Sequence, residues 1–377
     1  MKPQTSPRPS KCLALCAMAL ALQAAAASAH AQIVIGQTAA FNGPDGSYVR
    51  EARLGATLYF DAVNEQGGIH GQKIELVSID DDADPQRAAA NVRTLLQGWQ
   101  AMALFLPHGT ATSQAAAAAI GAQPAALIGP SSGAHALRQP LQPYVFNVRA
   151  SYRRELQQAL QGMNRLGLTR FVVIQSGDAF GDDAAVGITD AAIPVKPLLT
   201  ERFDPAHPGF DGIAERVARL DPHVVFMIAD TAAAVAGIQA VRAAGSRAQV
   251  LTLSNNATNR FIDALGPLAR GVAVTQVFPY ERSMVSPLVK RAMDVARTRG
   301  VHGLSQPLME GFAAAQVLIE GLRRAGPKPD RDKLITALNS IQRLNIGGMM
   351  IDYSSRDHTG SNYTDTSVIS GLGRFQR

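Results

Sequence analysis

The sequence predicts an α/β protein made of two doubly wound parallel-sheet lobes. Short apolar runs alternate with helical segments from residue 32 onward, the pattern restarts near the middle of the chain, and no low-complexity linker separates the two halves. Continuous apolar strands joined by helices are typical of parallel sheets covered on both faces. The 377 residues, 46% of them hydrophobic and 18% charged, suffice for two domains with packed cores.

Residues 1–31 have the composition of a secretory signal peptide. A basic start is followed by an apolar stretch over residues 12–27 and by the ending Ser-Ala-His-Ala, with small residues at the two positions that a signal peptidase reads. We therefore expect cleavage after Ala31 and a periplasmic protein. The basic residues are Lys2, Arg8 and Lys11.

Two alternatives to a cleaved signal are weaker. The apolar stretch is shorter than the roughly 20 residues that a membrane-spanning helix needs. A lipoprotein would be modified at Cys16, but the bulky Leu15 stands where a small residue is expected.

Loss of the signal changes the charge and the cysteine content. Three basic residues are removed, so the formal net charge falls from +6 to +3. Both cysteines, Cys12 and Cys16, are removed as well. The remaining basic residues are scattered, which gives nucleic-acid binding little support. The mature chain has no disulfide or thiol chemistry.

The first unit is predicted from its strands and its helix start signals. Asp84-Pro85 is a strong start, with Asp as the N-cap and Pro in the first turn. The expected strands are Ile33–Gly36, Ile74–Asp80, Ala101–Pro107 and Ala125–Pro130. The expected helices are Ser47 to Glu65, Pro85 to Trp99 and Ser113 to Ala122.

The second unit repeats this organisation and leads into a helical block. Gly167 and Gly245 stand just past two helices, as C-terminal glycines do. The expected strands are Phe171–Gln175, Val224–Ala229, Val250–Leu253 and Val272–Val277. The expected helices are Leu156 to Leu166, Ile213 to Leu220, Ala232 to Ala244, Leu288 to Arg299, Leu308 to Ala325 and Lys333 to Ile341.

Many loose motifs follow one another in an order that resembles a known family. They are Asn42-Gly43-Pro44, Asn64 to Ile69 with Gly71, Asp80-Asp81 with Asp84-Pro85, Phe180-Gly181, Phe203-Asp204-Pro205, Glu310-Gly311-Phe312 with Ala314-Ala315, and Asp357-His358 with Gly360. Over residues 32–377 the chain resembles the Leu/Ile/Val-binding type of periplasmic solute-binding proteins of ABC transporters.

The resemblance implies a type I periplasmic-binding fold, in which three chain crossings join the lobes. We place these crossings near Phe146–Arg149, Val277–Pro279 and Ile351–Ser354. Lobe 1 is then 32–147 plus 278–352, and lobe 2 is 148–277 plus 353–377. In open α/β sheets ligands bind beyond the carboxyl ends of the strands, and these ends would face each other across a cleft.

The loop from Pro107 to Ser113 is the first candidate for ligand binding, because it follows a strand and opens a helix. Helix N-termini bind anions through free amides. By resemblance, Thr110 matches the position whose hydroxyl and amide hold a ligand carboxylate, and His108 is the histidine nearest to this site. The alternative is that Thr110 only caps its own helix.

The loop Gly129–Gly133 is the second candidate. The family presents a threonine here, and Gly133 occupies its position, so Ser131 or Ser132 is expected to substitute. Two aromatic residues match those that cover the ligand, one from each lobe. They are Tyr48 and Phe180, and Gln276 completes the expected set.

The group that would bind a ligand ammonium is the open question. The resemblance places a carboxylate where this chain has Asn256, and a neutral amide gives up most of the attraction for a buried ammonium. Either Asp230 supplies the charge, or the ligand is an organic acid without an amine. Asp230 is equally well explained as a helix N-cap. We expect acids without an amine to bind at least as well as leucine.

No enzyme, metal or cofactor motif stands out. There is no Gly-x-Ser-x-Gly elbow, P-loop or Gly-x-Gly-x-x-Gly after a strand, and Asp80 to Asp84 lacks the glycine and glutamate of a calcium loop. We expect a monomeric, non-enzymatic capture protein that binds a small ligand and docks on a membrane permease. A ligand sensor of the same fold, or a periplasmic hydrolase, are the alternatives.

Overall fold

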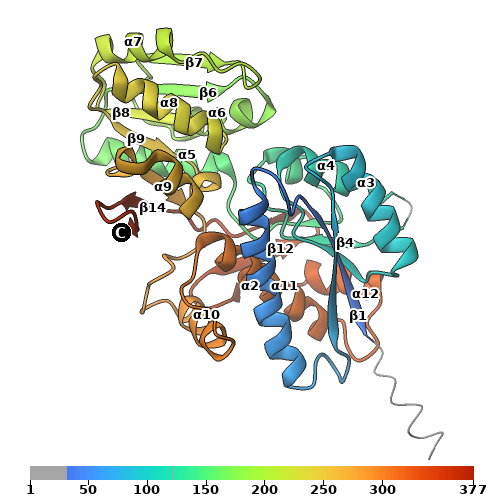
Figure 1. The fold of residues 1–377 in the computed structure, drawn as a ribbon. Coiled ribbons are helices and arrows are strands. Elements are labelled where there is room, and N and C mark those ends of the chain that lie inside the picture. Colours follow the sequence, from blue (N-terminus) through green and yellow to red (C-terminus); the bar gives the residue numbers. More distant parts are fainter. Residues whose placement is uncertain (1–31, 122) are drawn as a thin grey trace, which may run out of the picture.

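The computed structural model describes residues 32–121 and 123–377 as two α/β lobes (Figure 1). The signal peptide predicted at residues 1–31, with Cys16, lies outside the described residues. Within the described part of the chain, no helix combines the length and the apolar character needed to cross a bilayer.

Lobe 1 contains a five-stranded parallel sheet in the order β2-β1-β3-β4-β5. The strands are β1 (Ile33–Ala39), β2 (Ile74–Asp80), β3 (Ala103–Phe105), β4 (Ala126–Ile128) and β5 (Val145–Phe146). The helices are α2 (Gly46–Glu65), α3 (Pro85–Arg93), α4 (Thr110–Ala119), α10 (Pro287–Thr298), α11 (Gln306–Arg324) and α12 (Arg331–Asn339). A π-helical turn, Thr94–Gly98, extends α3, and His135–Leu137 form a 3-10 turn.

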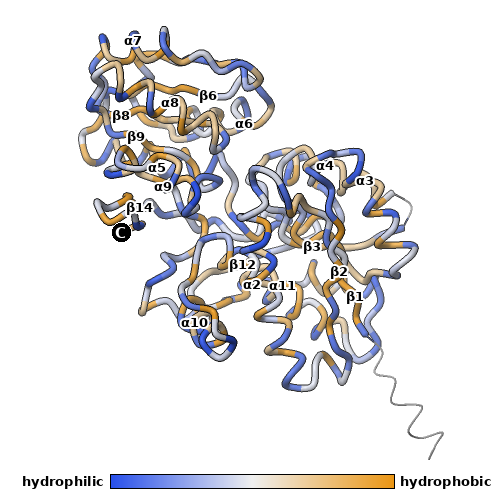
Figure 2. Tube along the Cα trace, viewed as in Figure 1, coloured by the Kyte–Doolittle hydropathy of each residue, from blue (hydrophilic) through white to orange (hydrophobic). Residues whose placement is uncertain are grey.

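The strands of lobe 1 other than the edge strand β2 are buried on both faces. Along β3, Ala103 and Phe105 pack on the side of α2 and α11, whereas Leu104 packs on the side of α3 and α4. Figure 2 shows the apolar residues concentrated along the strands, as expected for a sheet with two covered faces.

Helix α11 lies at the centre of lobe 1, and nearly all of its residues are buried. It packs against α2 (Figure 1), and two glycines lie at the contact. A Cβ atom on Gly311 would lie 1.7 Å from the carbonyl oxygen of Ala52, and one on Gly55 would lie 2.0 Å from that of Leu308. The two helix backbones are therefore in direct contact.

Lobe 2 contains a seven-stranded sheet in the order β15-β14-β10-β9-β8-β6-β7. Its parallel strands are β6 (Phe171–Ser176), β7 (Leu199–Phe203), β8 (Val224–Ile228), β9 (Gln249–Thr252) and β10 (Ala273–Gln276). Antiparallel β14 (Asp365–Ile369) and β15 (Phe375–Gln376) complete it. The helices are α5 (Tyr152–Arg165), α6 (Ala179–Asp190), α7 (Asp211–Leu220), α8 (Thr231–Ala243) and α9 (Asn259–Leu265), with 3-10 turns at Ser254–Asn256 and Gly266–Ala269.

The third chain crossing lies later than the sequence predicts. Strands β11 (Leu344–Asn345), β12 (Met350–Ser354) and β13 (Asp357–Gly360) form a small antiparallel sheet. It belongs to lobe 1, because the Tyr353 hydroxyl donates to the carbonyl of Asn147 at 2.6 Å and the His358 ring stacks on Phe146 at 4.1 Å. The chain enters lobe 2 only at residues 361–364, so the expected crossing at Ile351–Ser354 falls within β12.

The other two connections between the lobes follow β5 and β10. Residues 147–151 connect β5 of lobe 1 to α5 of lobe 2, and Val277 and Phe278, which follow β10, already pack in the core of lobe 1.

Candidate functional site

A cavity of about 370 Å³ lies between the two lobes. Six of the ten residues predicted from the sequence line it: Tyr48, His108, Thr110, Ser131, Phe180 and Asp230. The other lining residues are Asp45, Gly109, Ala111, Gln114, Arg149, Tyr152, Asp178, Ala179 and Asn255.

Five helices, α2, α4, α5, α6 and α8, begin at the wall of the cavity, and three of them have an aspartate as N-cap. Asp45 precedes α2, Asp178 precedes α6 and Asp230 precedes α8. The carboxylates of Asp178 and Asp230 accept hydrogen bonds from the first turns of their own helices, at 3.0 and 2.8 Å. The carboxylate of Asp45 makes no capping hydrogen bond to α2. Helix α4 differs from these three helices because its N-cap, Gly109, has no side chain, and no other side chain caps it. Its positive end thus faces the cavity with neither an acid nor a capping side chain at its N-cap.

The first turn of α4 has free hydrogen-bond donors. The first helical hydrogen bond runs from the amide of Ser113 to the carbonyl of Gly109, so the amides of Thr110 and Ala111 have no partner within the helix. The hydroxyl of Thr110 pairs with that of Ser132 at 2.9 Å. Thr110 therefore does not cap its own helix, and this turn can bind an anion.

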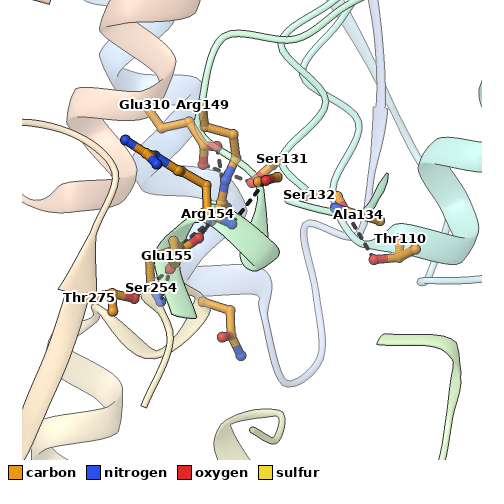
Figure 3. A network of polar contacts seen from close by, with 12 residues as sticks. Thr110, Ser131, Ser132, Ala134, Arg149, Arg154, Glu155, Ser254, Thr275 and Glu310 are labelled. Atoms are coloured by element: carbon orange, nitrogen blue, oxygen red, sulfur yellow. Dashed lines mark hydrogen bonds and ion pairs between the residues drawn. The ribbon is translucent and has the colours of Figure 1, made fainter. Parts of the chain in front are cut away.

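Arg149 lies at the floor of the cavity, between two buried carboxylates (Figure 3). Its side chain is only 2% exposed. One terminal nitrogen lies 3.0 Å from Oε1 of Glu155, and the other lies 3.7 Å from Oε1 of Glu310. Burial lowers the pKa of Arg149, but Tyr152, Glu310 and Glu155 more than offset this effect and raise the pKa overall. Arg149 is therefore a permanent cation with its charge already paired.

The two carboxylates anchor Arg149 to different lobes. Glu155 of α5 accepts hydrogen bonds from the amide and the hydroxyl of Ser254, both at 2.9 Å, and from the hydroxyl of Thr275. Glu310 of α11 belongs to lobe 1. The network therefore connects the lobes beneath the cavity.

Aromatic rings form the apolar walls. Tyr48 packs against His108 with ring centroids 5.0 Å apart, and Tyr152 meets Phe180 edge-on at 4.8 Å. Burial lowers the pKa of His108, so its imidazole is neutral at pH 7. The contact between Tyr152 and Phe180 links the start of α5 to the start of α6.

The structure corrects the prediction for Asn256. Its side chain is fully buried, donates to the carbonyl of Ala229 at 3.1 Å and accepts from the hydroxyl of Thr231 at 2.9 Å. It therefore supports the loop and does not line the cavity. The neighbouring Asn255 lines it instead.

Three further predicted residues lie behind the cavity wall. Ser132 is fully buried, as its contact with Thr110 requires. A Cβ atom on Gly133 would lie 2.6 Å from the amide nitrogen of Tyr152, which explains a glycine where the family presents a threonine. Gln276 is 1% exposed in β10 and does not line the cavity.

Sequence reasoning missed Arg149, Tyr152 and Asn255. The end of strand β9 locates the lining residue only to within one position, because the 3-10 turn Ser254–Asn256 determines whether Asn255 or Asn256 faces the cavity. Arg149 lay inside a predicted crossing, but its role depends on partners far away in the chain.

Among the described residues, no group of three or more His, Cys, Asp or Glu side chains could hold a metal ion.

Comparisons with known proteins agree with this architecture. The chain is 23% identical over 346 residues to Leu/Ile/Val-binding protein homolog 3 of Brucella melitensis, covering 87% of this chain and 89% of that protein. It is 39% identical to Leu/Ile/Val-binding protein BraC3 of Rhizobium johnstonii, but only over 79 residues, 20% of this chain and 22% of that protein.

A solved structure and a family model extend the likeness over almost the whole chain. The crystal structure of a substrate-binding periplasmic protein from Ralstonia solanacearum has a TM-score of 0.81 and 28% identity, covering 91% of this chain and 99% of that one. The model of the family described as periplasmic binding protein matches residues 32–368. The chain therefore belongs to the periplasmic binding protein family, as the order of its motifs suggested.

Proposed function

We propose that this protein is the periplasmic solute-binding component of an ABC importer and that its lobes close on a small ligand that carries a carboxylate. The observation that carries the proposal is the uncapped N-terminus of α4 at an interlobe cavity. The protein captures its ligand and does no chemistry on it, and we propose that it reaches the periplasm through a cleaved signal peptide.

The ligand carboxylate is placed at the first turn of α4. The amides of Thr110 and Ala111 are donors, and the helix end contributes positive potential. The hydroxyl of Thr110 is a further donor when Ser132 supplies the hydrogen of their mutual contact. The three aspartates of the lining would repel an anion elsewhere in the cavity.

The lining also favours a protonated amine on the same ligand. Asp45, Asp178 and Asp230 contribute negative charge, whereas Arg149 is paired with two carboxylates. Oδ1 of Asn255 is a buried acceptor without a hydrogen-bond partner among the described residues. We therefore propose an α-amino acid. This proposal reverses the expectation that acids without an amine bind at least as well as leucine. That expectation was drawn from Asn256, and the side chain of Asn256 does not reach the cavity.

Calorimetric and thermal-shift titrations of the purified protein test the proposal. The probes are the standard amino acids and the desamino analogue of each tight binder, such as 4-methylpentanoate for leucine. An amino acid at 100 times its Kd should stabilise the folded protein by about 2.7 kcal/mol. Tighter binding of the desamino acid would overturn the amine assignment, and no response to any carboxylate would overturn the proposed ligand class.

Replacement of Thr110 with valine should weaken binding of that amino acid by roughly 1.5–3 kcal/mol, because a hydrogen bond to a charged group is lost while side-chain shape is kept. Titration calorimetry measures the change. The control is Thr200→Val on the exposed edge strand β7, which should leave Kd unchanged. Equal affinity of the Thr110 variant and the unaltered protein would move the carboxylate away from α4.

A further inference from the structure

Two hydroxyl groups of the cavity wall share a single buried acceptor. The hydroxyl of Tyr48 donates to Oε2 of Glu310 at 2.6 Å, and that of Ser131 donates to the same oxygen at 2.8 Å. Tyr48 and Ser131 line the cavity, whereas Glu310 does not and is only 2% exposed. Glu310 can therefore affect a ligand only through residues that do line the cavity, namely these two and its ion-pair partner Arg149.

The direction of these hydrogen bonds is fixed by chemistry. An ionised carboxylate only accepts hydrogen bonds, and each hydroxyl has a single hydrogen. Both hydrogens are thus committed to Glu310, and the hydroxyl oxygens keep only their lone pairs for a ligand. Ser131 therefore cannot donate to a ligand carboxylate.

Arg149 pairs with the carboxylate of Glu310, and the surroundings keep the Tyr48 hydroxyl neutral. The guanidinium of Arg149 lies 3.7 Å from Oε1 of Glu310, and this oxygen has no hydrogen-bond donor among the described residues. Burial and the nearby carboxylate of Glu310 raise the pKa of the Tyr48 hydroxyl well above its ordinary value. The Tyr48 hydroxyl therefore keeps its hydrogen at neutral pH.

We propose that Glu310 is a positioning residue that sets the hydrogen-bond polarity of the cavity wall and makes Ser131 an acceptor for a ligand amine. The assignment rests on the proposed function of the cleft. It divides the cavity into a donor side at α4 and an acceptor side at Ser131. A ligand with a carboxylate and an adjacent protonated amine satisfies both sides, and one without the amine leaves Ser131 without a donor.

Glu310→Gln tests the proposal, because the introduced amide can donate to the Ser131 oxygen and release its hydrogen toward the cavity. Calorimetry would compare Kd for the tightest-binding standard amino acid with Kd for its desamino analogue. We expect the preference for the amino acid to fall roughly tenfold or more, the size of a lost hydrogen bond to a charged group. An equal loss of affinity for both ligands would overturn the proposal and make Glu310 merely structural.

Two further variants keep the test decisive if the Glu310 variant folds poorly. Ser131→Ala removes the acceptor with little change in the fold and should lower the same preference, whereas an unchanged preference would overturn the proposal. Glu281→Gln is the matched control, because Glu281 is a buried carboxylate 3.2 Å from the amide nitrogen of Gln306 and outside the cavity lining. If the unaltered protein binds neither ligand, the proposed function fails, and this inference fails with it.

Discussion

Replacement of Arg149 with methionine is expected to lower the free energy of unfolding by about 3–5 kcal/mol. The change leaves Glu155 and Glu310 buried without the cation that lies between them, at 3.0 and 3.7 Å. Removal of one partner from a buried charge network costs more than the network itself contributes, because the remaining charges stay out of water. Urea unfolding followed by circular dichroism measures the loss.

Two comparisons separate this effect from a general loss of charge. Arg87→Met removes one partner of an ion pair whose side chains are 59% and 52% exposed, and should cost less than about 1 kcal/mol. Arg149→Met combined with Glu155→Gln and Glu310→Gln should recover most of the stability, because no uncompensated charge remains. A loss below about 1 kcal/mol for Arg149→Met alone would mean that water or rearrangement already compensates the two carboxylates.

Replacement of Gly311 with alanine is expected to cost about 3 kcal/mol, because an added methyl group has no room between α11 and α2. The new Cβ would lie 1.7 Å from the carbonyl oxygen of Ala52, and a backbone atom cannot turn away as a flexible side chain can. The helices must separate, and the contact between Gly55 and the carbonyl of Leu308 is then lost as well. Urea unfolding also measures this change.

Gly162→Ala provides the matched control for that substitution. Gly162 lies inside α5, and the nearest atom to its added Cβ is the flexible Nη2 of Arg165 at 3.9 Å. Here alanine should stabilise the protein by up to about 1 kcal/mol through helix propensity alone. Similar changes in the free energy of unfolding for the two substitutions would show that α2 and α11 can move apart without destabilising the protein.

The fold could be predicted because its local signals agree with one another. Asp84 caps α3 through hydrogen bonds to the amides of Gln86 and Arg87, at 2.7 and 3.3 Å, as its position before Pro85 indicates. Gly167 and Gly245 have positive φ angles at the ends of their helices. Strands buried on both faces are continuous apolar runs, and these are the easiest strands to recognise.

Elements with weaker patterns were missed. Strand β7 (Leu199–Phe203) lies at a sheet edge and alternates between half-buried and exposed residues, so it lacks an apolar run. Helix α6 (Ala179–Asp190) has three acids and two glycines among its 12 residues, which weakens its helical pattern. The place of β12 and β13 depends on Tyr353 and His358, whose contacts lie about 200 positions back in the chain.

The candidate site could be predicted as far as strand ends locate it. Thr110, Ser131 and Asp230 all follow parallel strands, and such strands end at one edge of a sheet. Arg149 and Glu310 could not be predicted, because their roles depend on pairing between lobes and no local pattern encodes it. Tyr152 could not be predicted either, because an aromatic residue at a helix start is equally typical of an ordinary core position.

The contact between α2 and α11 has a consequence for biosynthesis. Strands β6 to β10 of lobe 2 come from one continuous stretch of the chain. Helix α2, in contrast, packs against α11, which is translated about 250 residues later. A nascent or partly translocated chain thus exposes the apolar face of α2 until α11 emerges, and such surfaces are what chaperones bind. Lobe 2 should reach its native state first, with the N-terminal half of lobe 1 held open until the C-terminal helices arrive.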